Sequence, residues 1–216
     1  PDNPNEFYVA YASGGLWYTQ NSGNTFTPIF DHEAVMTIGD IAVDWKNGTI
    51  WVGTGESNSS RSSYSGMGVY KSLDKGKTWH NVGLKDTHHI GRIIINPDNP
   101  NQVWVAAIGH LYSPNAERGI FKTNNGGETW KKTLYINENT GAIDLEINPK
   151  NPKELYTSVW RRERKAWNFV ESGAESGIYK STDGGENWSL ITGVSGGFPQ
   201  GNTNGRIGLS IYPQNT

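Results

Sequence analysis

The chain of 216 residues contains no cysteine and only two methionines. Without cysteine, disulfide cross-links and thiol chemistry are excluded, and the redox compartment cannot be read from cysteine usage. The net charge is only −2, so no basic surface for a nucleic-acid partner is expected. No apolar run is long enough to cross a bilayer as a helix, so no membrane span is expected.

Apolar residues and helical patterns are also scarce. Only 34% of the residues are apolar, and no segment shows sustained helical periodicity. Aromatic residues make up 12% of the chain, with nine tryptophans, and glycine occurs 27 times. Each aromatic side chain can bury roughly 150–250 Å², so a chain of this length can still bury a core. These features favour an all-β protein built from short strands and turns.

One eight-residue pattern occurs four times: Ser/Thr, any residue, Asp/Asn, any residue, Gly, any residue, Thr/Asn and an aromatic residue. The copies, which we call the repeat turns, are residues 19–26, 72–79, 123–130 and 181–188. Their third positions, Asn21, Asp74, Asn125 and Asp183, are 53, 51 and 58 residues apart, a spacing typical of an array of supersecondary units. We expect these four side chains to be structural and to accept backbone N–H groups two residues on, with glycine at positive φ.

Two kinds of turn divide each period into four strands. The repeat turn joins a third strand to a fourth, which begins at the aromatic residue, and a Pro-Asn turn joins the first strand to the second. The predicted first strands are residues 41–45, 93–96, 145–148 and 209–212, and the second strands are 7–12, 49–54, 103–108 and 155–160. Four antiparallel strands per period of about 50 residues predict a β-propeller blade.

The repeat turn resembles the Asp-box, or BNR repeat, of Asp-box β-propellers. That group includes sialidases, xyloglucan-degrading hydrolases, photosystem-assembly propellers and sortilin-type sorting receptors. The resemblance covers nearly the whole chain. The run at residues 177–185 and the Ile-Asn-Pro turns at 95–97 and 147–149 are most similar to sortilin-like propellers of bacterial secreted proteins, which are often labelled glycosyl hydrolases. This resemblance implies an extracytoplasmic location, meaning secreted, periplasmic or at the cell surface.

Residues 1–216 are therefore expected to form a single propeller segment of about four blades. The N-terminal part supplies the second, third and fourth strands of one blade, and the C-terminal part supplies a lone first strand. We expect consecutive blades of a larger propeller, because closure of a four-bladed disc, the alternative, would duplicate the Pro-Asn turn. In an open array, missing blades or a partner chain would cover the unpaired edges.

The two faces of such a propeller differ. The Pro-Asn turns and the repeat turns share one face, which we call the turn face. The loops between second and third strands and between blades share the opposite face, which we call the loop face. Loops that vary on a constant scaffold commonly carry function, so we expect a peptide, protein or carbohydrate ligand on the loop face.

The candidate ligand-binding residues lie on the inner strands and in these loops. Asp40, Arg92 and Asp144 occupy equivalent positions near the channel mouth, where a structural salt-bridge ring is the alternative. The loop candidates are Glu56, Arg61, His88, His110, Glu117, Arg118, Arg161, Arg162 and Trp167. The basic stretch 161–165 could bind an acidic ligand, and Trp167 could stack on a sugar or pair with a cation; a packed, solvated loop is the alternative.

No metal or cofactor is expected. Adjacent residues of an extended segment point to opposite sides, so His88 and His89 should not share one ion. The four repeat-turn carboxyl and amide groups are spread one to a blade, which does not assemble a calcium site.

Three functions remain open. A ligand-binding propeller is favoured. A glycoside hydrolase would need two facing carboxyl groups, drawn from Asp40, Glu56, Glu117, Asp144 and Glu163. Sialidase activity is disfavoured, because the Arg-Ile pairs at 92–93 and 206–207 are not followed by proline. The third possibility is a structural subunit of a larger assembly.

Overall fold

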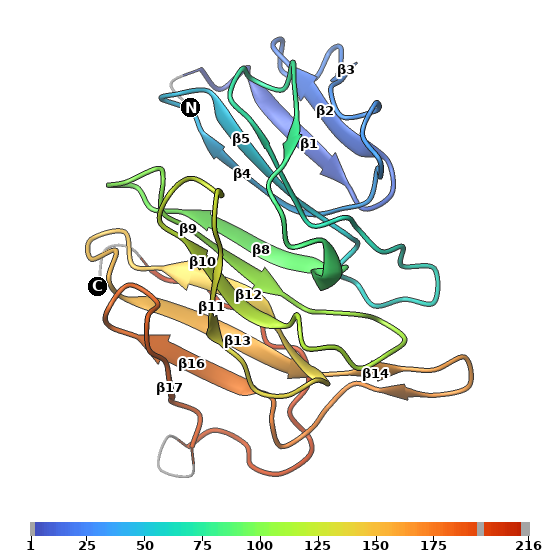
Figure 1. Ribbon diagram of the computed structural model, residues 1–216, viewed down its shortest axis with the longest axis vertical. Helices are drawn as coiled ribbons and strands as arrows, with labels where there is room; N and C mark the ends of the chain where they lie inside the picture. Colours follow the sequence, from blue (N-terminus) through green and yellow to red (C-terminus); the bar gives the residue numbers. More distant parts are fainter. Residues whose placement is uncertain (1–2, 194–196, 213–216) are drawn as a thin grey trace.

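The computed structural model describes residues 3–193 and 197–212 (Figure 1). Blade 1 contains β1 (Phe7–Tyr11), β2 (Gly15–Thr19) and β3 (Thr27–Pro28); blade 2 contains β4 (Ile38–Asp44), β5 (Thr49–Thr54), β6 (Val69–Ser72) and β7 (His80–Asn81). Blade 3 contains β8 (Ile90–Ile95), β9 (Val103–Ala107), β10 (Gly119–Thr123) and β11 (Lys131–Leu134). Blade 4 contains β12 (Thr140–Ile147), β13 (Leu155–Arg161), β16 (Gly177–Ser181) and β17 (Ser189–Leu190).

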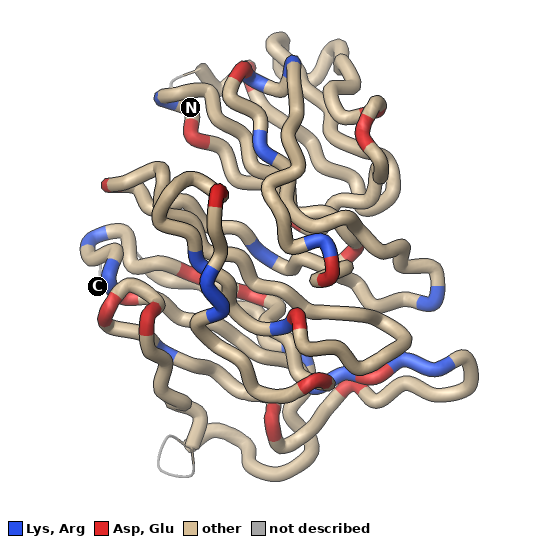
Figure 2. The backbone as a smooth tube through the Cα atoms, viewed as in Figure 1, with Lys and Arg blue, Asp and Glu red and all other residues tan. Residues whose placement is uncertain are grey.

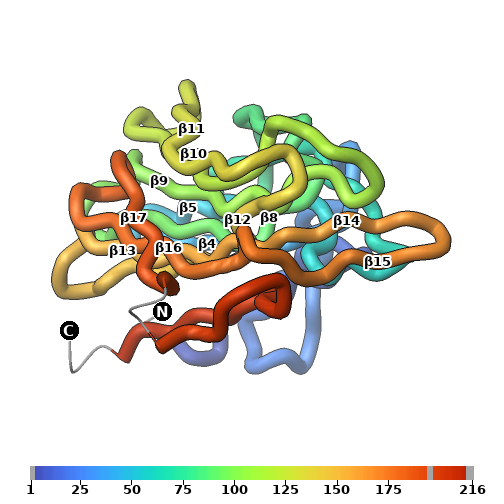
Figure 3. Tube along the Cα trace, turned by 90° about the horizontal axis from the view of Figure 1, so that it is seen from below, coloured from blue at the N-terminus to red at the C-terminus, as the bar shows by residue number. Residues whose placement is uncertain are grey.

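Two small elements lie outside the blade sheets. A single 3₁₀ turn, η1 (Lys85–Thr87), precedes blade 3. A hairpin of β14 (Glu163–Arg164) and β15 (Phe169–Val170) interrupts blade 4 and projects beyond the sheets (Figures 1 and 3). Among the described residues, no helix has the length and apolar character that a membrane crossing requires.

Each blade is an antiparallel meander, and the blades follow one another as an open arc (Figure 1). The prediction of an all-β propeller with four-stranded blades is confirmed, and the chain forms a partial propeller of about four blades. Blade 1 has three strands, as expected. The hydrophobic cores lie between successive blades: one centres on Leu16 and Ile50, the next on Trp51 and Val105, and the third on Trp104.

The boundaries of the inner strands differ from the prediction. β4, β8 and β12 begin at residues 38, 90 and 140, three to five residues earlier than expected. Each contains a register shift near its start, which disguises the period of two in the sequence. Residues 209–212 were expected to be a strand but do not belong to any strand of the described residues, and the β14–β15 hairpin was not predicted. The sequence also predicts a last Pro-Asn turn at residues 213–215, which lies outside the described residues.

The repeat turns are held by local hydrogen bonds that reach further than expected. The Asp74 carboxylate accepts the Thr78 N–H at 2.9 Å and the Thr78 hydroxyl at 2.7 Å, four residues on rather than two. Ser72 Oγ donates to Asp74 and accepts the Gly76 N–H at 2.8 Å. The indole N–H of Trp79 donates to the Ile29 carbonyl of the preceding blade, so the aromatic position joins neighbouring blades.

Candidate functional site

The inner strands place Asp40, Arg92 and Asp144 at equivalent positions of three consecutive blades. Each follows the register shift of its strand, and β4, β8 and β12 lie next to one another. Asp40 Oδ2 accepts the N–H of Ile93 at 2.7 Å, and Asp144 Oδ2 accepts the N–H of Leu209 at 2.9 Å. Both carboxylates therefore connect one inner strand to the next stretch of chain.

Arg92 forms ion pairs between the inner strands β8 and β12. Its Nη2 donates to Glu146 Oε1 at 3.1 Å, and its Nε lies 3.9 Å from Asp144 Oδ1. This geometry supports the salt-bridge alternative for the inner strands. Ligand contact by these residues stays a prediction.

Burial raises the pKa of Asp40 to about 6, although the Ile93 N–H and Arg92 favour the charged carboxylate. An acid whose pKa is higher in the folded protein loses stability as pH rises from its unfolded value, near 4, to its folded value. We expect Asp40→Asn, which can still accept the Ile93 N–H, to raise the free energy of unfolding at pH 7.5 by about 1–3 kcal/mol. At pH 4 the substitution should have little effect. Urea unfolding at both pH values measures this, and an equal effect at both would contradict it.

One buried arginine ties the loops of three blades together. Arg162, directly after β13, is 1% exposed. Its guanidinium donates to Ser59 Oγ in the blade 2 loop and to the Gly109 carbonyl in the blade 3 loop, the latter at 2.8 Å. Burial lowers its pKa to about 9. Arg162 thus faces the interior rather than solvent, and it fixes the loops relative to one another.

Arg118 has a similar place within the blade 3 loop. It is also 1% exposed, and burial lowers its pKa to about 10. Its guanidinium donates to the carbonyls of Ile108, His110 and Ser113 at 2.8–2.9 Å. One buried side chain therefore ties together three carbonyl groups at the start of and within this long, polar loop.

The remaining loop candidates are spread over the loop face. The Glu56 carbonyl lies 2.8 Å from Nδ1 of His89, and Arg61 offers its carbonyl to the Tyr112 hydroxyl at 2.8 Å. Glu117 pairs with Lys132 at 3.0 Å. The charge of the basic stretch is partly neutralised, because Lys165 Nζ lies 2.7 Å from Glu163 Oε1. Figure 2 shows basic and acidic residues mixed along the β14–β15 hairpin.

Large aromatic side chains are exposed at the loop face. Tyr64 and Tyr112 are 65% and 54% exposed, and Trp167, at the tip of the hairpin, is 82% exposed. Single exposed aromatic residues are normal on a protein surface, but three on the loops of one face offer apolar area that a ligand could cover. Each of these loops forms hydrogen bonds to Arg162 or to a neighbouring loop. For example, the Arg164 N–H donates to the Leu111 carbonyl at 3.3 Å.

The prediction for His88 and His89 assumed an extended segment, whereas His88 has a φ of 55° and a ψ of −42°, and the closest ring pair involves His110 instead. His89 is buried against the Glu56 carbonyl, and burial lowers its pKa to about 3. The His88 ring instead stacks on His110, with centroids 3.6 Å apart, and both approach Asp86. Asp86 was not among the candidates: no motif links it to His110, which lies 24 residues further along the chain.

Comparisons with solved structures show the same fold. An ancestral GH74 enzyme superposes with a TM-score of 0.65 at 21% identity, over 90% of this chain and 23% of that one. The GH74 xyloglucanase of Xanthomonas campestris gives 0.62 at 16% identity, over 88% and 29%. An extracellular domain ascribed to a hybrid two-component system of B. thetaiotaomicron gives 0.58 at 14% identity, over 94% and 23%. The chain thus spans less than a third of each of these structures.

Comparison with the curated proteins finds no significant match. The family model described as sortilin, neurotensin receptor 3, matches residues 67–199, which is more than half of the chain. The match begins two residues before β6 and runs through blades 3 and 4, with three of the four repeat turns, Arg162 and the blade 3 loop that it contacts at Gly109; Ser59 lies before the match. This partial propeller therefore belongs to the Sortilin-Vps10 family.

Proposed function

We propose that the loop face binds a peptide or protein ligand. The observation that carries the proposal is the set of exposed aromatic side chains, Tyr64, Tyr112 and Trp167, on loops held by buried arginines. Tyrosine and tryptophan are enriched among the residues that dominate binding energy, and rigid loops lose little entropy on binding. The family is named for a neurotensin receptor, which supports a peptide as the ligand.

A glycan is the second candidate ligand. Aromatic rings also stack on sugars, and one structural neighbour is a xyloglucanase. For a hydrolase, two carboxyl groups would have to face the sugar, and Asp40 and Asp144 already accept backbone N–H groups. Binding therefore has more support than turnover. We further propose an extracytoplasmic location, in line with the extracellular neighbour.

The test compares two faces of the same chain. A displayed library of random peptides is selected on the wild-type protein, and xyloglucan and other polysaccharides are tested in parallel. The loop-face variant carries Tyr64→Ala, Tyr112→Ala and Trp167→Ala. The control carries Phe26→Ala and Trp45→Ala, exposed aromatic residues of the turn face. We expect selected peptides to bind the loop-face variant at least tenfold more weakly, an effect of roughly 1.4 kcal/mol or more.

Several outcomes would count against the proposal. Peptides that bind both variants equally would place the ligand elsewhere, and failure to select any peptide would argue against a peptide site. Binding of a polysaccharide alone would favour the glycan alternative. Release of reducing ends that Asp144→Asn or Glu56→Gln abolishes would instead show a hydrolase.

A further inference from the structure

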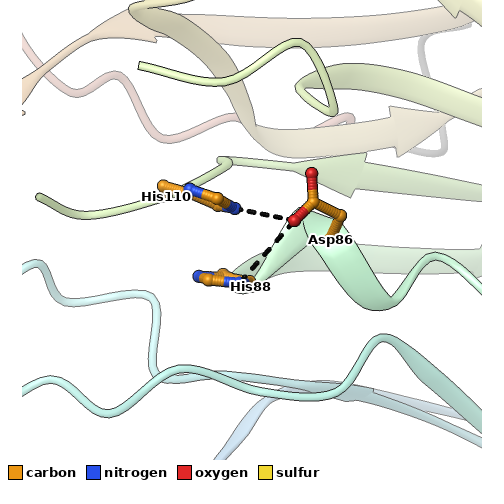
Figure 4. Close-up of side chains that lie close together, drawn as sticks. All are labelled: Asp86, His88 and His110. Atoms are coloured by element: carbon orange, nitrogen blue, oxygen red, sulfur yellow. Dashed lines mark hydrogen bonds and ion pairs between the residues drawn. The ribbon is translucent and has the colours of Figure 1, made fainter. Parts of the chain in front are cut away.

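Asp86, His88 and His110 lie close together on the loop face, and their side chains are of kinds that bind metal ions (Figure 4). Asp86 belongs to η1, His88 follows η1, and His110 follows β9. One ligand atom from each residue lies within 4.8 Å of the others. The two imidazole rings stack, with centroids 3.6 Å apart and an interplanar angle of 20°, and Nε2 of each ring lies within 3.9 Å of the same carboxylate oxygen.

The spacing suits a small tetrahedral ion. Asp86 Oδ1 lies 3.1 Å from His110 Nε2 and 3.9 Å from His88 Nε2. Ligand atoms about 2.0–2.1 Å from a tetrahedral zinc ion are about 3.3 Å from one another. Because the lone pair of each Nε2 lies in its ring plane, the partly exposed His88 ring must turn out of the stack, and the exposed Asp86 side chain must shift with it, for the three ligand atoms to surround one ion. We propose that Asp86, His88 and His110 bind a divalent transition-metal ion of the zinc class.

Surrounding contacts hold two of the ligands in place. Ser113 Oγ lies 2.9 Å from His110 Nδ1, the ring nitrogen that faces away from Asp86, and such partners orient metal-binding histidines. Asn115 joins the two loops, because its Nδ2 donates to the Asp86 carbonyl and its Oδ1 accepts the His110 N–H, both at 2.9 Å. Arg118 in turn donates to Asn115.

The backbone of His88 is held in a conformation that histidine seldom adopts. Its φ is 55° and its ψ is −42°. Such a conformation costs on the order of 1–3 kcal/mol and persists only where the surroundings hold it. Its carbonyl accepts the Gly66 N–H at 2.6 Å, and a Cβ at Gly55 would lie 1.8 Å from that carbonyl oxygen. The close backbone packing thus holds the His88 backbone beside the His110 loop, while the part-exposed ring is free to turn.

The ligand set indicates the class of ion. Two imidazole nitrogens and one carboxylate oxygen suit zinc and its neighbours, whereas calcium and magnesium prefer oxygen ligands alone. Asp86 is exposed and both histidines are partly exposed, so an ion can enter and a fourth position faces solvent. Three protein ligands with an open position are typical of catalytic rather than structural zinc sites. Bound metal would also cross-link the loop before blade 3 to the loop within it.

The test titrates the untagged full chain with zinc chloride in a calorimeter. We expect one Zn²⁺ per chain with micromolar or tighter affinity, and a cobalt complex with the visible absorption of a tetrahedral site. Asp86→Asn, His88→Asn and His110→Gln should each weaken zinc binding at least tenfold; asparagine at position 88 tolerates the positive φ. His32→Gln and His80→Gln are matched controls, since both histidines are exposed and lie outside the cluster.

Zinc should also raise the melting temperature of the wild type and of both controls, but not of the three cluster variants. No binding by the wild type at about 100 µM zinc would overturn the proposal, because that concentration far exceeds a micromolar dissociation constant. The proposal would also be overturned if a cluster variant bound zinc like the wild type, or if a control variant lost zinc binding as much as the cluster variants. Circular dichroism of each apo variant distinguishes loss of the site from loss of the fold.

Discussion

Gly91→Ala is expected to unfold much of the partial propeller. A Cβ at Gly91 would lie 2.2 Å from the carbonyl oxygen of Ile143 and 2.9 Å from its carbonyl carbon. These are backbone atoms of β12, so no side chain can rotate away, and blades 3 and 4 would have to separate. A Cβ at Gly39 would likewise lie 1.9 Å from the carbonyl oxygen of Ile90. We expect a loss of about 3 kcal/mol or more, which is a large share of the stability of a typical domain.

Urea unfolding followed by tryptophan fluorescence measures this loss. Gly193→Ala is the matched control, because a Cβ there meets no atom of the described residues within 4 Å. The control should stay within about 0.5 kcal/mol of the wild type, as surface substitutions usually do. A Gly91→Ala protein with the wild-type midpoint would show that the blades can move apart at this point at little cost.

Arg162→Ala should have the second large effect, a loss of about 2–4 kcal/mol. The substitution leaves a cavity and removes the hydrogen bonds to Ser59 and to the Gly109 carbonyl. Buried polar groups that lose their partners keep the cost of desolvation. The blade 2 and blade 3 loops should also become more mobile, because the exposed hydrogen bond from the Tyr112 hydroxyl to the Arg61 carbonyl would then have to hold them together without the buried arginine.

Hydrogen exchange tests the second part of this prediction. Amides in residues 55–66 and 109–118 should lose protection in Arg162→Ala, while those of β9 and β10 should change less. Arg61→Ala is the control, since Arg61 is exposed and its carbonyl, rather than its side chain, meets Tyr112. Unchanged exchange in both loops would mean that Arg162 fills space without holding them.

Much of the fold could be predicted because its signals are local. The hydrogen bonds of each repeat turn join residues two to four apart, so the pattern from Ser72 to Trp79 contains the information that forms the turn. The repetition of this turn at a regular spacing predicted the blades. Where the prediction failed, the cause was also local: register shifts at the starts of β4, β8 and β12 broke the alternation on which strand boundaries depend.

The amino-acid sequence by itself determined the all-β class, the four-stranded blades, and the division between a uniform turn face and a variable loop face. Tertiary structure alone decided which polar loop residues are buried and which meet. Arg162 reaches Ser59 across 103 positions, and His110 reaches Asp86 across 24. Nothing in a local pattern distinguishes a buried arginine from a solvated one. These contacts exist because successive blades bring their loops to one face, and that arrangement depends on how the blades pack.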